Sequence, residues 1–390
     1  MRTYERSHPW ITFRLDLRHS GPRLWMDLGE AASKCEHIAG VPLRPATARE
    51  LHRLFLAKGA LATTAIEGNT LTEGEVLDHL QNKLDLPRSK EYLAQEIDNI
   101  VAACRAIGER CLQGDDTLTP KTVAEFNRQV LDKLPLKEGV IPGRLRHDSV
   151  VVGNVYRGAP PVDCEHLLER LCTWLNGPDF RAPKGMELAY AVLEAVVAHV
   201  YLAWIHPFDD GNGRTARLME FHILLAAGVP TPAAHLLSNH YNQTRAEYYR
   251  LLDQASKSGD DLVPFVEYAV RGFVDGLREQ LALIRGQQFD VVWRNYVHEK
   301  FHDRNSPHEV RQRHLVLDLS LSPGSVPIAR ITEVSPRIAR AYAGKSTKTL
   351  QRDLAALEAL ELIERTANEV RARREVVSAF LPWRRSGAAK

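Results

Sequence analysis

The spacing of apolar residues along the chain predicts a mainly α-helical protein. From residue 47 onward, apolar side chains recur three and four positions apart, which is the period of a helix with one buried face. We expect helices at residues 49–66, 89–109, 120–131, 164–175, 186–205, 213–227, 245–257 and 262–284. A further helix is expected to start at Thr72, because Glu75 stands three residues on and completes a capping box. The first 45 residues instead predict strands and turns, from Trp10-Ile11-Thr12-Phe13 and Gly21-Pro22.

One segment, residues 141–161, interrupts the helical pattern. Its β-branched run Val150-Val151-Val152 meets the turn signal Gly153-Asn154, which predicts a β-hairpin. A hairpin of two strands is only marginally stable by itself. We therefore expect it to act as a flap, or as an edge to which an extended partner segment adds.

A second type of composition begins near Ser306-Pro307. Helices are expected at residues 308–319, 335–342 and 346–360, followed by a strand at 361–365 and an arginine-rich hairpin that ends at Phe380. Residues 304–390 carry 16 Lys or Arg and 9 Asp or Glu, a net charge of +7, so the first 303 residues have a net charge of −5. The overall charge of +2 thus hides a basic module attached to a mildly acidic body.

Composition excludes several classes of protein. The chain has 390 residues and is 44% hydrophobic, which suits two or three folded domains and excludes a disordered or fibrous chain. Five cysteines, with no CxxC pair, predict free thiols and a cytoplasmic protein. The most apolar stretch, residues 188–205, contains Glu194 and His199. Because a carboxylate is costly in the middle of a bilayer, we expect a buried helix there and no membrane partner.

The residues that point to chemistry lie in one loop, His206-Pro207-Phe208-Asp209-Asp210-Gly211-Asn212-Gly213-Arg214-Thr215-Ala216-Arg217. The loop joins two apolar helices. Gly211 and Gly213 allow a tight turn and the close approach of a ligand. The unpaired N–H groups at the start of the second helix attract phosphate.

Charged side chains complete this phosphate site. Arg214 and Arg217 are three residues apart on one helix face, where both can grip polyphosphate oxygens. Asp210 is suited to a magnesium ion on those phosphates, and His206 can accept a proton near neutral pH. Each feature alone is typical of an ordinary turn or helix end, but together they predict a phosphoryl- or nucleotidyl-transfer site.

The loop resembles the signature of the Fic family, HxFx(D/E)GNGRxxR, and matches it at every specified position. The resemblance covers about residues 47–285. It implies transfer of AMP from ATP to a Ser, Thr or Tyr hydroxyl of a target protein, with release of pyrophosphate. It implies that His206 is the general base, that Phe208 anchors the loop and that Asp210 binds magnesium. It also implies that Gly211, Asn212 and Gly213 form the anion hole, and that Arg214 and Arg217 contact the β- and γ-phosphates. The related Doc kinases have a lysine in place of the second glycine, so Gly213 argues against their chemistry.

An upstream segment, Thr63-Thr64-Ala65-Ile66-Glu67-Gly68-Asn69, resembles the inhibitory motif of the same family, (S/T)xxxE(G/N). Thr63 and Glu67 stand at its defined positions. A glutamate near Arg217 would pair with it and occupy the place of the γ-phosphate, so that ATP binds only in a pose unfit for attack. In the alternative interpretation, Glu67 merely ends a helix beside Gly68.

Two further segments resemble parts of the family that surround the nucleotide. The segment Val150-Val151-Val152-Gly153 resembles the family flap, which clamps the target segment and borders the nucleotide. Tyr248-Tyr249 resembles the tyrosine pair that lines the adenine pocket, although ordinary core aromatics would give the same pattern. Ser256 stands where some relatives have an asparagine, which leaves the choice of nucleotide base open.

Residues 335–380 resemble a winged helix-turn-helix. Ser346 or Thr347 would cap its second helix, and the inward positions would be Leu350, Leu354 and Leu357. The outward positions would be Lys345, Lys348, Gln351 and Arg352, and the wing would hold Arg371, Ala372, Arg373 and Arg374. Such a module contacts DNA through phosphates and base edges, or binds proteins instead, and both partners stay open.

We therefore expect a mainly α fold with a helical Fic core, a β-hairpin flap and a C-terminal winged helix-turn-helix domain. The expected parts are a docking region at residues 1–46, an inhibitory-helix region at 47–95, the Fic core at 96–285, a linker at 286–305, the winged helix at 306–383 and a tail at 384–390. The expected function is a self-restrained protein adenylyltransferase that uses ATP and Mg²⁺ and also modifies itself.

Three alternatives remain at this point. The same site could transfer another nucleotide, or it could remove AMP with Glu67 positioning a water. The chain could also be a DNA-binding regulator whose Fic core is a nucleotide sensor. Family members often form dimers, so a homodimer is one assembly that the resemblance allows.

Overall fold

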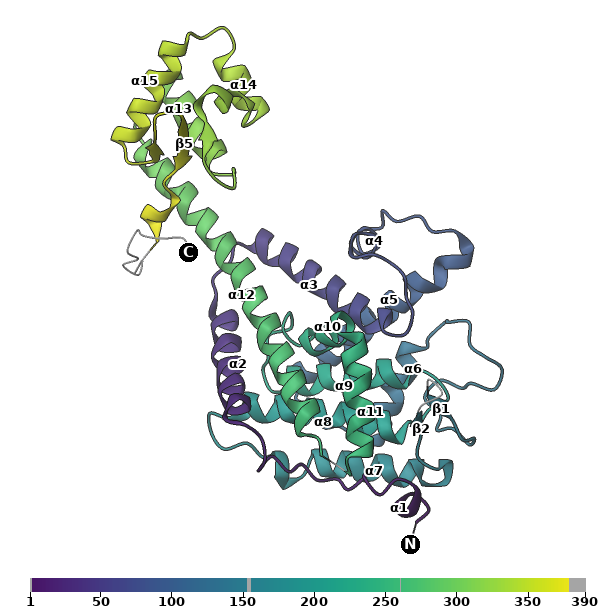
Figure 1. The fold of residues 1–390 in the computed structure, drawn as a ribbon. Helices are drawn as coiled ribbons and strands as arrows, with labels where there is room; N and C mark the ends of the chain where they lie inside the picture. The colour runs from purple at the N-terminus through teal and green to yellow at the C-terminus, as the bar shows by residue number, and fades with distance from the viewer. Residues whose placement is uncertain (1, 153–155, 260, 379–390) are drawn as a thin grey trace. The chain divides into compact units, whose positions relative to one another are not determined.

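The structure is a computed structural model that describes residues 2–152, 156–259 and 261–378 (Figure 1). The chain divides into two compact units, Met1–Leu281 and Ala282–Lys390. The helices of the first unit are α1 (Tyr4–Ser7), α2 (Pro22–Gly40), α3 (Pro45–Ala65), α4 (Glu73–His79), α5 (Glu91–Leu112), α6 (Pro120–Val130), α7 (Cys164–Leu175), α8 (Glu187–Ile205), α9 (Asn212–Ala226), α10 (Leu236–Gln243), α11 (Arg245–Lys257) and the first part of α12 (Val263–Lys300).

Helices α8 and α9 form the centre of the first unit, with other helices around them (Figure 1). They pack against each other, α5 and α6 pack on α9, and α2 and α7 pack on α8. Helix α8 is long and apolar enough to cross a membrane by length and composition, yet 72% of its most apolar window is buried inside the protein. A helix that is apolar on nearly every side is suited to the middle of a helical core. The expectation of a buried helix here is therefore confirmed.

The interrupting segment forms a small antiparallel hairpin of β1 (Val151–Val152) and β2 (Tyr156–Arg157). Val151 pairs with Arg157, and Val152 pairs with Tyr156. The predicted flap residue Gly153 lies outside the described residues. An isolated bridge between Leu145 and Phe208 joins the approach to this hairpin to the loop after α8.

The second unit contains the end of α12, then α13 (Pro307–Leu319), α14 (Pro336–Tyr342) and α15 (Thr347–Ala359). Three short strands, β3 (Val326–Pro327), β4 (Ile363–Arg365) and β5 (Glu369–Ala372), form an antiparallel sheet in the order β3-β5-β4. Leu354 and Leu357 are fully buried, as predicted for the inner face of α15, whereas Leu350 is only partly buried. Gln351 is also partly buried, because it accepts a hydrogen bond from Arg365.

Two predictions about helices in the first unit were wrong. The first 45 residues contain the helix α2, because Pro22 fits the first helical position and Leu24, Leu28, Ala31, Cys35 and Ile38 are buried along one side. The prediction gave too much weight to the aromatic run at residues 10–13. Helix α10 was missed, since eight residues are too few to show a clear period.

The helix expected to end at residue 284 continues to Lys300, so residues 286–300 of the predicted linker are helical. This part is polar, but it contains one glycine and no proline. Trp293, Val297 and Phe301 recur every four residues and are buried in the core of the second unit. Burial of this stripe stabilises the helix where the polar composition had predicted a connector.

Candidate active site

A cavity of about 570 Å³ lies in the first unit where α8 ends and α9 begins. Six predicted site residues line it, Glu67, Val152, His206, Gly213, Tyr248 and Tyr249. Tyr156, Trp204 and Arg250 also line it and were not predicted. Residues up to 186 positions apart in the sequence, Glu67 and Asp253, thus meet at one cavity of a size typical for small-molecule ligands.

His206 ends α8 in the left-handed region, with φ of 50°, and Pro207 prevents the helix from continuing. Its backbone N–H donates to the carbonyl of Leu202 at 2.8 Å, and its ring Nδ1 lies 3.4 Å from the carbonyl of Ala203. A carbonyl can only accept, so Nδ1 carries the proton and Nε2 keeps a lone pair. Burial lowers the pKa of His206 to about 4, and the ring is therefore neutral at physiological pH.

Arg146 holds the backbone around His206, a role that the sequence did not suggest. Its side chain is 1% exposed and donates to the carbonyls of His206 at 2.6 Å and of Asp148 at 2.6 Å, and also to the carbonyl of Ala159. Its backbone N–H donates to the carbonyl of Pro207 at 3.0 Å. A single buried guanidinium thus fixes the end of α8 relative to the segment before the hairpin.

The loop between the two central helices is closed by its own side chains. Phe208 is 1% exposed, as expected for an anchor. Asn212 accepts from the N–H of Phe208 at 3.0 Å and donates to its carbonyl at 2.8 Å. Gly211 has φ of 76°, a conformation that favours glycine. The Asn212 side chain is thus used to shape the loop, which leaves the backbone N–H groups at the start of α9 to face an anion.

Asp210 and Arg214 form an ion pair beside the loop. Arg214 donates to Asp210 at 3.2 Å and to Glu96 at 2.9 Å. The N–H of Gly211 donates to the same Asp210 oxygen at 2.5 Å, and the Asp210 side chain is 44% exposed. Glu96 was not predicted, because it lies 118 residues before Arg214 and no local pattern marks it.

Arg217 is paired with the predicted inhibitory segment. Its Nη2 donates to Glu67 at 2.5 Å and to the backbone carbonyl of Thr63 at 2.9 Å, and the Arg217 side chain is 1% exposed. A Cβ added at Gly213 would collide with a carboxylate oxygen of Glu67, so only glycine leaves room for that carboxylate at the start of α9.

The charge state of Glu67 is set by two opposing effects. Burial raises its pKa, but the nearby charge and hydrogen bond of Arg217, with smaller contributions from Arg214 and His206, hold the pKa of Glu67 below its ordinary value. Glu67 is thus an anion at neutral pH and lies where a helix N-terminus and a buried arginine both favour negative charge.

Tyr248 joins the cavity to a buried polar network. It is 3% exposed, and its hydroxyl lies 2.8 Å from Nε2 of His199. Nδ1 of His199 is 3.2 Å from a carboxylate oxygen of Glu220, and Tyr241 donates to the same oxygen at 2.9 Å. Tyr249 is 46% exposed, with its ring centre 5.0 Å from that of Tyr248. The two tyrosines thus differ, one fixed in the core and one at the mouth of the cavity.

The predicted flap contributes one described residue to the cavity. Val152 lines it, whereas Val151 is 54% exposed and the carbonyl of Val150 accepts from Gly158 at 3.2 Å. The structure therefore brings the loop, the predicted inhibitory segment, one valine of the predicted flap and both tyrosines together. Of the cavity lining, Trp204 belongs to the helical pattern of α8, but nothing in the sequence assigned it to a site.

Part of the chain that lines this cavity matches a known family. Residues 117–224 match the Fic/DOC family. The chain is similar to protein adenylyltransferase Fic of Nematostella vectensis, with 30% identity over 210 residues, or 54% of this chain and 45% of that protein. It is also similar to protein adenylyltransferase fic-1 of Caenorhabditis elegans, with 33% identity over 213 residues, or 54% of this chain and 38% of that protein. The chain thus spans less than half the length of these curated relatives.

Solved structures share the fold. A Fic family protein from Desulfovibrio desulfuricans G20 has a TM-score of 0.56 and 21% identity, and the match covers 92% of this chain and 98% of that chain. Residues 134–508 of Fic-1 from Caenorhabditis elegans have a TM-score of 0.54 and 24% identity, over 67% of this chain and 73% of that chain. At this identity the likeness concerns the fold alone.

Proposed function

We propose that this chain, whose residues 117–224 match the Fic/DOC family, transfers AMP from ATP to a Ser, Thr or Tyr hydroxyl of a target protein, and to itself. The observation that carries the proposal is the position of His206, a neutral base that lines a 570 Å³ cavity beside the N-terminus of α9. The names of the curated relatives, protein adenylyltransferases, support the same reaction.

In this reaction His206 acts as general base. Its Nε2 takes the proton of the incoming hydroxyl, the hydroxyl oxygen forms a bond to the α-phosphorus, and the bond from the α-phosphorus to the bridging oxygen of pyrophosphate breaks. With its pKa lowered by burial, His206 is ready to accept a proton but is a weak base. The negative charge of a bound polyphosphate raises the proton affinity of the ring and so favours the transfer.

The phosphates of ATP are assigned to the start of α9. Backbone N–H groups of Gly211, Asn212 and Gly213 would stabilise the charge that develops on the phosphates, because they are fixed before the substrate arrives. Arg214 and Arg217 would contact the β- and γ-phosphates. Both arginines are held by acidic residues in the free protein, so the phosphates must replace these partners.

Asp210 would hold Mg²⁺. Among the described residues no group of three or more His, Cys, Asp or Glu side chains could hold a metal ion. A magnesium ion at a bound nucleotide needs only one carboxylate from the protein, because phosphates and water supply its other ligands. The Asp210 carboxylate fits this role because it is partly exposed beside the proposed phosphate site. When bound, the ion neutralises charge on the phosphates and on the leaving pyrophosphate.

Tyr248 and Tyr249 are proposed to contact the nucleobase of ATP. Val152 and Tyr156 line the same cavity on the side of the hairpin. Val150, Val151 and Val152 would also carry the target segment, since the exposed edge of a short strand can pair with an extended peptide. With these contacts, the acceptor hydroxyl would be presented to His206 across the cavity.

We also propose that Glu67 restrains the enzyme. The ion pair between Glu67 and Arg217 uses the guanidinium that the γ-phosphate needs. ATP must either displace Glu67 or bind without the Arg217 contact, and in the second pose its α-phosphate is not aligned with the acceptor. Thr63 supports this inhibition through its backbone carbonyl, which accepts a hydrogen bond from Arg217.

Two other activities of the same site, transfer of another nucleotide and removal of AMP, are not favoured by the names of the relatives. A nucleotide-sensing DNA regulator is not favoured either. We also propose that the protein is located in the reducing cytoplasm, because its five cysteines are free thiols.

For the second unit we propose a winged helix-turn-helix that binds duplex DNA. The order of its helices and strands and the outward cations of α15 support this. Lys345, Lys348 and Arg352 are exposed, and none of the ion pairs among the described residues involves them. Phosphate binding by these cations predicts that log affinity falls linearly with log salt concentration. A flat salt response would exclude the proposal.

The test of the enzymatic proposal is incubation with Mg²⁺ and ATP labelled at the α-phosphate. Glu67→Gly should incorporate more label than the wild type, and addition of His206→Ala to that variant should abolish incorporation. Glu50→Gly is a matched control, because Glu50 is an exposed residue of α3 and should leave labelling unchanged. Equal labelling with and without His206 would refute the assignment of the base.

A further inference from the structure

A glycine stands in the interior of α3, the helix that leads to the predicted inhibitory segment. Gly59 is buried and lies eight residues before Glu67. In the interior of a helix, glycine is less favourable than alanine, because its backbone loses more conformational freedom on folding. A buried glycine at this position is explained by a neighbour that leaves no room for a side chain.

That neighbour is His235, which directly precedes α10. A Cβ added at Gly59 would collide with the imidazole ring of His235 and would lie 2.7 Å from its Cβ. Carbon atoms in ordinary contact are about 3.5–4.0 Å apart. Rotation of the side chain could move the ring, but the Cβ of His235 is fixed by its backbone. Only glycine therefore allows α3 to pack as closely on the start of α10 as it does (Figure 1).

The same ring packs on α9, the helix that carries Arg217. The ring centres of His235 and Phe221 are 4.5 Å apart, and both residues are buried. Phe221 lies four residues after Arg217, about one turn farther along α9. Because a protein interior is closely packed, the His235 ring acts as a spacer between α3 and α9.

The proposed inhibitory ion pair joins the same two helices. Arg217 of α9 donates to the backbone carbonyl of Thr63 at 2.9 Å and to Glu67 at 2.5 Å. Thr63 lies four residues after Gly59, so the two residues share one face of α3. The packing at Gly59 thus positions the part of α3 from which Glu67 reaches Arg217.

A second contact holds the end of α3. Arg245, at the start of α11, donates to the backbone carbonyl of Ala65, the last residue of α3, and to the side chain of Asn242 at 3.1 Å. We call the two contacts, Gly59 with His235 and Ala65 with Arg245, the α3 seat. None of these four residues lines the nucleotide cavity.

We propose that the α3 seat keeps Glu67 on Arg217 and thus maintains the inhibition. This inference rests on the proposed restraint by Glu67 and names the part of the fold that holds the glutamate in place. A side chain at Gly59 would require α3 and α10 to separate by about 1 Å. The same displacement would stretch the 2.5 Å contact of Glu67 with Arg217 to the limit of a hydrogen bond. A perturbation of the α3 seat would then make Arg217 available to the γ-phosphate from outside the nucleotide cavity.

The test is the preference for ATP over ADP, measured for the full chain by isothermal titration calorimetry with Mg²⁺. Because ADP lacks the γ-phosphate, a general change in the nucleotide cavity alters both affinities alike. Gly59→Ala should raise the preference for ATP at least about threefold. In a Glu67→Gln background the same substitution should add nothing further, because the contact that it weakens is already lost.

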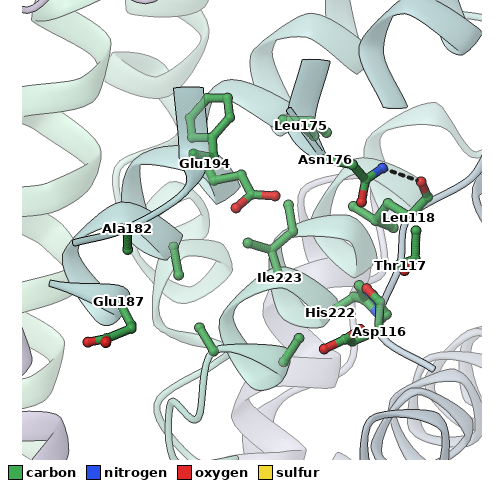
Figure 2. A pocket seen from close by; sticks show the side chains of 14 residues that line it. Asp116, Thr117, Leu118, Leu175, Asn176, Ala182, Glu187, Glu194, His222 and Ile223 are labelled. Atoms are coloured by element: carbon green, nitrogen blue, oxygen red, sulfur yellow. Dashed lines mark hydrogen bonds between the residues drawn. The ribbon is translucent and has the colours of Figure 1, made fainter. Parts of the chain in front are cut away.

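Gly177→Ala is the matched control, because it crowds a glycine elsewhere in the first unit. Its Cβ would lie 2.8 Å from the carbonyl oxygen of Trp174. Gly177 follows Asn176, which donates to the carbonyl of Leu118 at 2.7 Å beside a separate cavity that no residue of α3 or α10 lines (Figure 2). Gly177→Ala should lower the melting temperature, as Gly59→Ala should, but it should keep the wild-type preference for ATP.

A second variant loosens the α3 seat without crowding it. Arg245 is exposed, so Arg245→Met removes the hydrogen bond to Ala65 at little risk to the fold. This variant should raise the preference for ATP at least about twofold, and its result decides the question if Gly59→Ala does not fold. Arg53→Met, at an exposed position of α3, should keep the wild-type preference.

The results separate a failure of this inference from a failure of the proposed inhibition. An unchanged preference in Glu67→Gln would mean that Glu67 does not compete with the γ-phosphate, and the inhibition itself would be refuted. With a raised preference in Glu67→Gln, the α3 seat alone is refuted by a folded Gly59→Ala protein that keeps the wild-type preference, or by a gain from Gly59→Ala that persists in the Glu67→Gln background. Where Gly59→Ala does not fold, an unchanged preference in Arg245→Met refutes it.

Discussion

Replacement of Glu67 by glutamine should change how strongly the protein binds the γ-phosphate of ATP. Glutamine keeps the length of the side chain but removes the negative charge that holds Arg217. In the wild type, ATP reaches the Arg217 guanidinium only after this contact breaks. In the variant that cost is removed, so ATP should bind more tightly. ADP lacks the γ-phosphate and should bind with nearly unchanged affinity.

The size of the effect follows from the contact itself. A hydrogen bond between charged groups contributes about 1.5–3 kcal/mol. The Arg217 side chain is 1% exposed, but the Glu67 side chain is 34% exposed, and solvent weakens the pair. We therefore take the lower part of the range, about 1.5–2 kcal/mol, which corresponds to about a 10- to 30-fold gain in affinity.

The measurement is the dissociation constant of ATP and of ADP for both proteins in the presence of Mg²⁺, by isothermal titration calorimetry. The preference for ATP over ADP should rise about 10- to 30-fold in Glu67→Gln. Glu50→Gln, on the exposed side of the same helix α3, should keep the wild-type preference. An equal gain for both nucleotides, or no gain for ATP, would refute the idea that Glu67 competes with the γ-phosphate.

Three other predictions follow from neighbouring contacts. Arg146→Met leaves at least three backbone carbonyls without the guanidinium that donates to them. It should lower the free energy of unfolding by at least about 3 kcal/mol in denaturant titrations. Arg144→Met, at an exposed position, is the control and should change the free energy of unfolding by less than about 0.5 kcal/mol. Gly213→Ala should lower the melting temperature because its Cβ collides with Glu67, and a second change, Glu67→Gly, should restore it. The pKa of His206 is lowered from 6.5 to about 4, so the unfolded chain binds more protons in this interval and stability falls as the pH falls from 6.5 toward 4. His206→Gln should reduce that slope, and an unchanged slope would contradict the neutral ring.

The central helices and the loop between them were predictable because their signals are local. Helix α7 was predicted at its observed bounds, Cys164–Leu175, and the capping box of Thr72 and Glu75 is present in full. A period of three to four residues and a cap are both contained within a short window of sequence. Helices whose stability depends on distant contacts were harder to predict. Helix α12 was predicted too short because the residues that bury Trp293 lie in a different part of the chain.

The same distinction holds at the site. The sequence predicted His206 and Arg217 as site residues from one motif and Glu67 from a second motif 150 residues upstream of Arg217, and the structure pairs Glu67 with Arg217. It did not identify Arg146 or Glu96, whose roles come from contacts made only in the folded chain. The residues next to Arg146 in the sequence do not show that it donates to distant backbone carbonyls, and those next to Glu96 do not show that it accepts from Arg214.

The central claim is that this chain transfers a nucleotidyl group from ATP by means of His206. The most direct measurement is parallel incubation of the Glu67→Gly protein, alone and with a cell extract as acceptor, with Mg²⁺ and ATP labelled at either the α- or the γ-phosphate. We expect that protein retains the α-label and not the γ-label, that pyrophosphate is released in equal amount, and that His206→Ala in the same background abolishes both. Retention of the γ-label, or no label on any protein including the chain itself, would show that this chain does not transfer AMP by means of His206.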